Sequence, residues 1–112
     1  MKKTVPRLQK LIRNLRRLGR EKNIKMWRAI ADELEKSTRR RRRVNIERIN
    51  RVTKEGETII VPVKVLGDGE IDHKVNVAAY QFSEKAKNKL NCITIEELME
   101  KNPKGSKVRI IG

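Results

Sequence analysis

Apolar residues near the start of the chain recur at steps of three and four positions, which places their side chains on one face of a helix. The residues of this stripe are Leu8, Leu11, Ile12, Leu15 and Leu18. Thr4 is suited to cap the helix, Pro6 falls in its first turn, and Gly19 marks its expected end. The pattern predicts an amphipathic first helix.

A second stripe of the same kind predicts a second helix that begins near Asn23. Its members are Ile24, Trp27, Ile30, Ala31 and Leu34. Charges of both signs occupy the other face, so we expect an ordinary solvated surface there. We expect Trp27 to lie in the core. The only other aromatic residues are Tyr80 and Phe82, too few and too scattered for a base-stacking surface.

Five consecutive arginines, Arg39–Arg43, follow this helix. Such a run has no apolar face and its charges repel one another, so we expect it to be extended or irregular and ordered only against a polyanion. Asn45 is then predicted to cap a short third helix. Its expected inward residues are Ile46, Ile49 and Val52, and its expected outward residues are Arg48 and Arg51.

The apolar period changes after residue 57. Residues 58–61 and 63–66 are predicted to form two short strands broken by Pro62, which cannot donate to a sheet ladder and should lie at an edge or bend. Residues 67–69 should form a turn at an acidic hairpin tip, and residues 74–79 another strand.

The rest of the chain alternates short helices and strands. Ser83 is predicted to cap a helix that runs to about Leu90, and Thr94 with Glu97 forms a capping box for another that ends near residue 101. Residues 92–93 and 107–111 should be strands, with a turn at 102–105. The expected fold class is mixed α/β: basic N-terminal helices followed by a small mixed sheet with two helices.

The positive charge is confined to the first half of the chain. Residues 1–54 hold 20 Lys or Arg and five Asp or Glu, whereas residues 55–112 hold nine of each, so the net charge of +15 falls in the first half. Such an excess attracts polyanions. We therefore divide the chain into a basic helical RNA-binding region, 1–54, and a small mixed α/β domain, 55–112.

Arginine forks pair bidentately with phosphate, and neutralising phosphates releases counterions, which provides affinity without sequence reading. The clustered arginines thus favour phosphate binding over a solvated face. The candidate RNA-binding residues are Arg7, Lys10, Arg13, Arg16, Arg17, Arg20, Arg39, Arg40, Arg41, Arg42, Arg43, Asn45, Arg48, Arg51 and Lys64.

Other chemistry finds little support in the sequence. His73, expected to be exposed, and Cys92, expected to be a small buried group, are too few for a zinc site. Asp68, Glu70 and Asp72 alternate as in a calcium loop, but later positions of that motif do not match. We expect no metal, cofactor, small-molecule substrate or catalytic group. No apolar run is long enough for a membrane span, and a single cysteine fits a reducing cytoplasm.

Several segments, in order along nearly the whole chain, resemble one protein family. They are Trp27–Ala31 after the basic helix, Val44–Ile49 after the arginine run, Ile60–Gly67, Val77–Ala79 with Phe82–Ser83, and Glu97–Leu98 through Asn102–Gly105. The sequence resembles the archaeal form of the eukaryotic-type large-subunit ribosomal protein eighteen family, whose fold is shared with bacterial large-subunit protein fifteen. The family usually has a glycine where this chain has Val63.

The resemblance implies structural binding of large-subunit ribosomal RNA on the cytoplasmic ribosome, beside neighbouring large-subunit proteins. Two other classes stay open at this point. Three basic helices could imitate a DNA-binding helix-turn-helix of a chromatin-type protein, although the arginine run makes the connection too long. Residues 5–20 could instead bind a membrane surface or a partner helix.

Overall fold

A computed structural model describes the backbone of residues 6–40 and 43–111, without the side chains of Pro6 and residues 37–40. Over these residues the chain forms five helices and five strands. In chain order they are α1 (Pro6–Glu21), α2 (Lys25–Arg40), β1 (Arg43–Asn45), α3 (Ile46–Val52), β2 (Thr58–Leu66), β3 (Asn76–Phe82), α4 (Glu84–Lys89), β4 (Asn91–Thr94), α5 (Ile95–Lys101) and β5 (Val108–Ile110).

The strands form one sheet in the order β1-β2-β3-β4, with β5 also paired to β2. Every described strand pair is parallel. The predicted mixed α/β class is confirmed, but the sheet is parallel rather than mixed. Because parallel neighbours need a crossover, the segment between β2 and β3 is a crossover loop and not the expected acidic hairpin.

Pro62 lies inside β2, which is one continuous strand in the middle of the sheet, so the predicted break and edge position are both wrong. On one side of β2, β5 pairs with Thr58–Ile60 and β1 pairs with Lys64–Leu66. On the other side, the register with β3 shifts between Val61 and Lys64. Pro62 therefore falls where one neighbour ends and the next begins, and its missing N–H interrupts no regular ladder.

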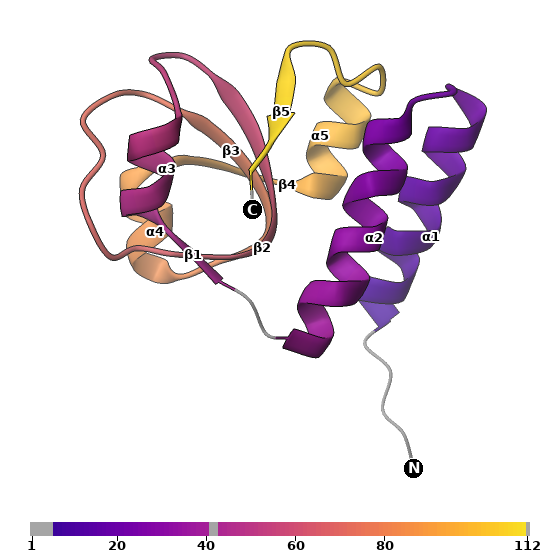
Figure 1. Ribbon diagram of the computed structural model, residues 1–112, viewed down its shortest axis with the longest axis horizontal. Helices are drawn as coiled ribbons and strands as arrows, with labels where there is room; N and C mark the ends of the chain where they lie inside the picture. The colour runs from indigo at the N-terminus through magenta and orange to yellow at the C-terminus, as the bar shows by residue number, and fades with distance from the viewer. Residues whose placement is uncertain (1–5, 41–42, 112) are drawn as a thin grey trace.

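The two faces of the sheet are covered by different helices (Figure 1). Ile59 and Val61 of β2 pack in a core with α3 and α4, whereas Ile60, between them, packs with α1, α2 and α5. This alternation follows from the two-residue period of a strand. Val63, buried in the first core, has no positive φ, so valine is accommodated without backbone strain.

The two apolar stripes predicted for the first helices face this second core. Leu11, Leu15, Trp27 and Ile30 are at most 1% exposed. The indole Nε1 of Trp27 donates a hydrogen bond to the carbonyl oxygen of Pro103 at 2.8 Å, which ties α2 to the turn before β5. The expectation that Trp27 is a core residue is confirmed.

The junction of α1 and α2 differs from the prediction. Helix α1 continues to Glu21, past Gly19, and α2 begins at Lys25 after Asn23 adopts a left-handed conformation with φ of 55°. A Cβ at Gly19 would lie only 2.8 Å from the Cγ atom of Arg28. Gly19 thus permits close packing of the two helices rather than ending the first.

The caps predicted from local sequence are largely confirmed. The hydroxyl of Ser83 accepts a hydrogen bond from the backbone N–H of Ala86 at 3.2 Å, and Thr94 with Glu97 forms the full capping box. Asn45 stands at the N-cap of α3, but its side chain makes no capping hydrogen bond. Thr4 lies outside the described residues.

Candidate nucleic acid interface

The outer face of α1 carries a row of cations at helical spacing: Lys10, Arg13, Arg17 and Arg20. Burial of Leu11 and Leu15 turns this row outward, and all four residues are exposed. Ten residues at about 1.5 Å rise each make the row about 15 Å long. Within the described part of the chain, Lys10, Arg13 and Arg20 have no ion-pair partner, and Arg17 donates only to Asn14 Oδ1 at 2.9 Å.

Arg16 lies at one margin of this row and is held within the protein. Its Nη2 atom is 3.1 Å from Asp32 Oδ1 and 2.8 Å from Glu35 Oε1, both on α2. These carboxylates offset its charge. The side chain is still 41% exposed, and such surface pairs contribute at most about 1 kcal/mol, so phosphate could compete for it.

Arg7, at the start of α1, is held by residues from the second half of the chain. Its Nε and Nη2 donate to the two carboxylate oxygens of Glu96 at 2.9 and 3.1 Å, and its guanidinium lies 4.4 Å from the centroid of the Tyr80 ring. The hydrogen bond to Glu96 raises the pKa of Arg7. Burial alone would raise the pKa of Glu96, but the hydrogen bond and charge of Arg7 outweigh it, and the pKa of Glu96 is lowered.

A second polar row crosses the sheet. Arg43 of β1 is the register partner of Lys64 of β2, which in turn pairs with Gln81 of β3, and all three are exposed. Beside Lys64 lies a hollow of about 500 Å³ at the carboxyl ends of β2, β3 and β4. It is lined by Arg7, Lys64, Tyr80, Gln81, Phe82, Lys87, Thr94 and Glu96.

The arginine run is not wholly extended, which corrects the prediction. Helix α2 continues through Arg40, and Arg43 belongs to β1, while Arg41 and Arg42 lie outside the described residues. Helix propagation adds one backbone hydrogen bond for each residue fixed, so a helix already anchored by buried Leu34 can extend into a repulsive segment.

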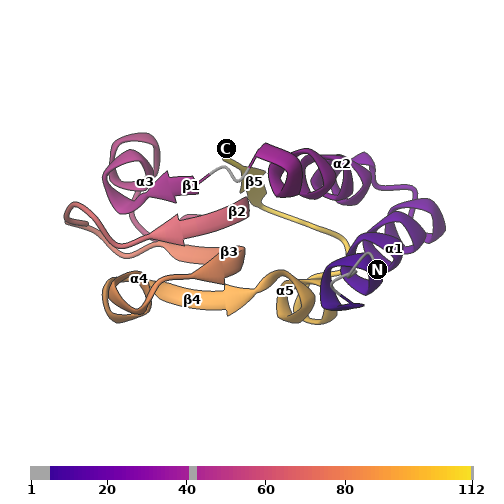
Figure 2. The ribbon, with the colours of Figure 1, turned by 90° about the horizontal axis from the view of Figure 1, so that it is seen from below.

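The candidates do not all share one surface. Arg48 and Arg51 are exposed on α3, which lies on the opposite face of the sheet from α1 (Figure 2). Asn45 is exposed at the end of β1. The structure therefore groups the α1 row, Arg7 and Lys64, and leaves α3 apart. Sequence reasoning did not include Tyr80, Gln81 or Lys87, which join this group only through folding.

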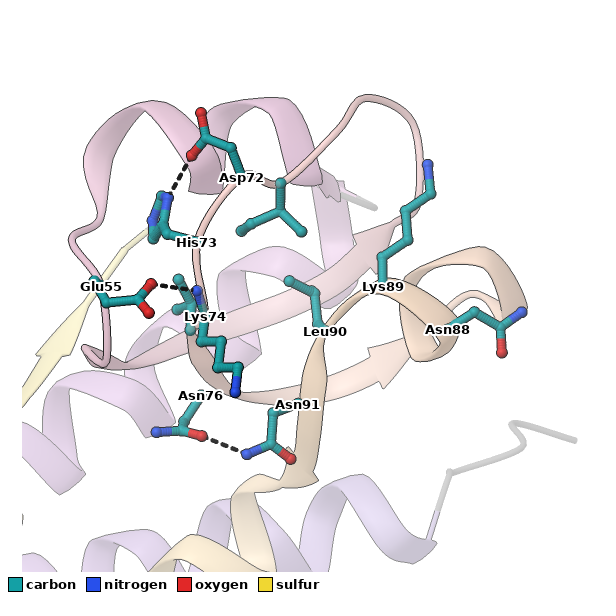
Figure 3. Close-up of a pocket in the computed structure, with 11 residues that line it drawn as sticks. Glu55, Asp72, His73, Lys74, Asn76, Asn88, Lys89, Leu90 and Asn91 are labelled. Atoms are coloured by element: carbon teal, nitrogen blue, oxygen red, sulfur yellow. Dashed lines mark hydrogen bonds and ion pairs between the residues drawn. The ribbon is translucent and has the colours of Figure 1, made fainter.

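A second hollow lies at the opposite ends of β3 and β4 and contains His73 (Figure 3). The His73 side chain is only 14% exposed, so the expectation of an exposed histidine is wrong. Its Nδ1 lies 2.8 Å from Asp72 Oδ1 and its Nε2 lies 2.8 Å from Thr53 Oγ1. The hydrogen bond with His73 lowers the pKa of Asp72.

This Thr53–His73–Asp72 arrangement resembles a catalytic triad in outline only. Thr53 is buried, and its hydroxyl donates to the carbonyl oxygen of Ile49 at 2.6 Å. The hydroxyl hydrogen is thus directed at the backbone and away from His73. The three side chains instead fasten the end of α3 to the crossover loop.

Other kinds of site find no support in the part of the chain that the structure describes. Among these residues no cluster of His, Cys, Asp or Glu could hold a metal ion. No described helix combines the length and apolar character needed to cross a bilayer. Cys92 is only partly buried, yet burial raises the pKa of its thiol to about 11.

Together, the parallel sheet, its helices on both faces and the cationic outer face of α1 define a small basic α/β protein. Comparison with known proteins identifies the group more closely. A family model that describes the ribosomal proteins 50S-L15 and 50S-L18e, together with a 60S counterpart, matches residues 4–93. The chain belongs to this family.

Individual relatives agree across nearly the full length of the chain. It is 52% identical to large ribosomal subunit protein eL18 of Methanosphaerula palustris and 49% identical to that of Methanoregula boonei, each comparison covering 99% of this chain and 96% of the relative. The corresponding protein of Methanothermobacter thermautotrophicus is 44% identical over 97% of this chain and 94% of its own length.

Proposed function

We propose that this chain is a non-catalytic structural constituent of an archaeal large ribosomal subunit, and that it binds ribosomal RNA mainly through phosphate contacts. The observation that carries the RNA contact is the outward row of Lys10, Arg13, Arg17 and Arg20 on α1. Its relatives bear the name of a large-subunit protein. Its place would then be the cytoplasmic ribosome, with ribosomal RNA and neighbouring large-subunit proteins as partners.

Within this proposal the two halves of the chain differ in their share of the RNA contacts. Residues 1–54 hold the whole net charge and supply most phosphate contacts, including those of the arginine run. Residues 55–112 add a few contacts, such as Lys64, and provide the sheet against which the basic helices pack. Arg7 and Arg16 contact phosphate while keeping, or exchanging, their carboxylate partners.

The competing classes fit the fold less well. A helix-turn-helix needs a tight turn before its recognition helix, but α2 and α3 are separated by β1, which pairs within the sheet. Membrane binding would need the apolar stripe of α1, and Leu11 and Leu15 are already buried against α2 and the sheet.

The proposal is tested by asking where the full chain resides in an archaeal cell. An affinity-tagged copy should sediment with the large subunit in a sucrose gradient and stay there after a wash in moderate salt. In vitro, deproteinised large-subunit RNA should compete with duplex DNA for the chain at equal concentration and salt, and win. Sedimentation apart from the large subunit, or displacement by duplex DNA, would contradict the proposal.

A further inference from the structure

The hollow beside Arg7 has features that phosphate contacts alone do not require. It lies at the carboxyl ends of three parallel strands, the place where open α/β sheets bind ligands. Its volume of about 500 Å³ is within the range of small-molecule sites, about 300–1,000 Å³. A smooth cationic face for an RNA backbone would not need such a recess.

The first feature is a flat, fixed surface. The guanidinium of Arg7 stacks 4.4 Å from the centroid of the Tyr80 ring, and two hydrogen bonds from Arg7 to Glu96 fix its orientation. Both Arg7 and Tyr80 line the hollow. Unstacked RNA bases are commonly recognised by stacking on aromatic rings and on arginine planes.

The second feature is an excess of positive charge in a small space. Three of the residues that line the hollow are cations, Arg7, Lys64 and Lys87, and only Glu96 carries a negative charge. Lys87 makes one loose ion pair with Glu84, at 3.6 Å, and Lys64 has no ion-pair partner among the described residues. This charge suits a phosphate at the mouth of the recess.

The third feature is a hydrogen-bonding group that can distinguish bases. Gln81 is exposed, and its side-chain amide has no hydrogen-bond partner within the part of the chain described by the structure. The neighbouring Thr94 hydroxyl is already engaged with Glu97 in the capping box. An amide offers both donors and an acceptor to the edge of a base.

We propose that this hollow receives one unpaired nucleotide of the RNA. Its base stacks on the Tyr80–Arg7 pair, Gln81 contacts the base edge, and Lys64 with Lys87 binds the adjoining phosphate. The inference rests on the proposed RNA-binding function and deepens it, because it assigns to one site an unpaired base rather than a duplex backbone. The three aromatic residues, scattered in the sequence, do not form a broad platform, but one of them completes a single-base site.

Photochemical cross-linking tests the placement directly. The full chain is bound to deproteinised archaeal large-subunit RNA, irradiated, and digested with trypsin and nuclease before mass spectrometry. The expected product is a nucleotide attached to the peptide of residues 75–85, which carries Tyr80 and Gln81. Cross-links that map only to other peptides would overturn the site.

Substitution separates base stacking from charge. Tyr80→Leu should weaken binding to a mixed-sequence single-stranded RNA by roughly tenfold, whereas Tyr80→Phe, which keeps the ring, should bind like the parent chain. Lys64→Ala should also weaken binding, and Lys104→Ala, an exposed lysine away from the hollow, is its matched control. Circular dichroism establishes that each variant is folded, and if Tyr80→Leu is not, the cross-link decides.

The outcomes distinguish this inference from the broader proposal. If folded Tyr80→Leu binds as tightly as the parent while Lys64→Ala does not, the hollow binds phosphate alone and the nucleotide site is refuted. Salt-dependent binding to ribosomal RNA would then persist, and the broader proposal would stand. If the parent chain fails to bind ribosomal RNA at all, both ideas fail together.

Discussion

Removing two cations from the outer face of α1 gives the sharpest prediction for RNA binding. Arg13 and Arg20 are exposed, lie about two turns apart and have no ion-pair partner among the described residues. Arg13→Ala with Arg20→Ala should therefore remove phosphate contacts without exposing a buried carboxylate. Because alanine favours helix and both sites are on the surface, folding stability should change by less than about 1 kcal/mol.

The size of the effect follows from counterion release. Removing one phosphate contact lowers the slope of log affinity against log salt by about 0.7–0.9, so the slope of the double variant should fall by about 1.4–1.8 units. Between about 50 and 200 mM salt, that difference corresponds to roughly a tenfold change in the ratio of parent to variant affinity. The variant should bind much more weakly than the parent at low salt and approach it at high salt.

The assay is filter binding of the full chain to deproteinised large-subunit RNA at a series of KCl concentrations. Lys101→Ala with Lys104→Ala is the matched control, since it removes the same charge from exposed positions near the end of α5. Arg16→Ala should give a smaller change in slope than Arg13→Ala, because Asp32 and Glu35 already offset its charge.

Two results would refute this reasoning. If the Arg13/Arg20 variant kept the parent slope, the row on α1 would be a solvated face. If the control flattened the slope equally, net charge alone would govern binding, and the position of the row would be irrelevant.

Four further predictions concern the arginine run and the fold. Replacing Arg40, Arg41 and Arg42 by alanine should weaken binding to ribosomal RNA and reduce its salt slope by somewhat less than one unit for each phosphate no longer neutralised, as measured by the same filter assay. Trp27→Ala should lower the free energy of unfolding by about 3–5 kcal/mol in urea titrations, since the indole is fully buried. Arg109→Ala should lower Tm more at pH 7 than at pH 3: the hydrogen bond from Arg109 lowers the pKa of Glu57, so the pair stabilises the fold above the ordinary carboxyl pKa of about 4.3 and the contribution is lost as pH falls. Cys92 should react with a thiol reagent at pH 8 much more slowly than free cysteine, because burial raises its pKa to about 11, and full reactivity should return in denaturant.

The features that sequence predicted well are those set by neighbours in the chain. Leu11, Leu15 and Trp27 are buried because a helical period places them on one face, whatever the partner of that face. Ser83 and Thr94 cap their helices through bonds that reach only three residues ahead. Such signals operate within one helical turn and need no knowledge of the fold.

The features that sequence missed depend on contacts between distant residues. Pro62 is tolerated in a central strand only because β5 and β1 meet β2 on either side of it, which no local pattern indicates. His73 is largely enclosed because the crossover loop returns to Thr53 at the end of α3. Tyr80 belongs to the candidate site only because folding brings it beneath Arg7.

The pattern of internal carboxylates sorts the arginines of α1 into two groups. Arg7 and Arg16, at the margins of the helix face, are oriented by acids from α5 and α2, while Arg13 and Arg20 in the middle point outward without such partners among the described residues. The marginal pairs relieve part of the repulsion along α1, so the helix can pack on the core before RNA neutralises the rest. A chain of net charge +15 can thereby present a preformed cationic face, and RNA binding need not supply the free energy of folding that face.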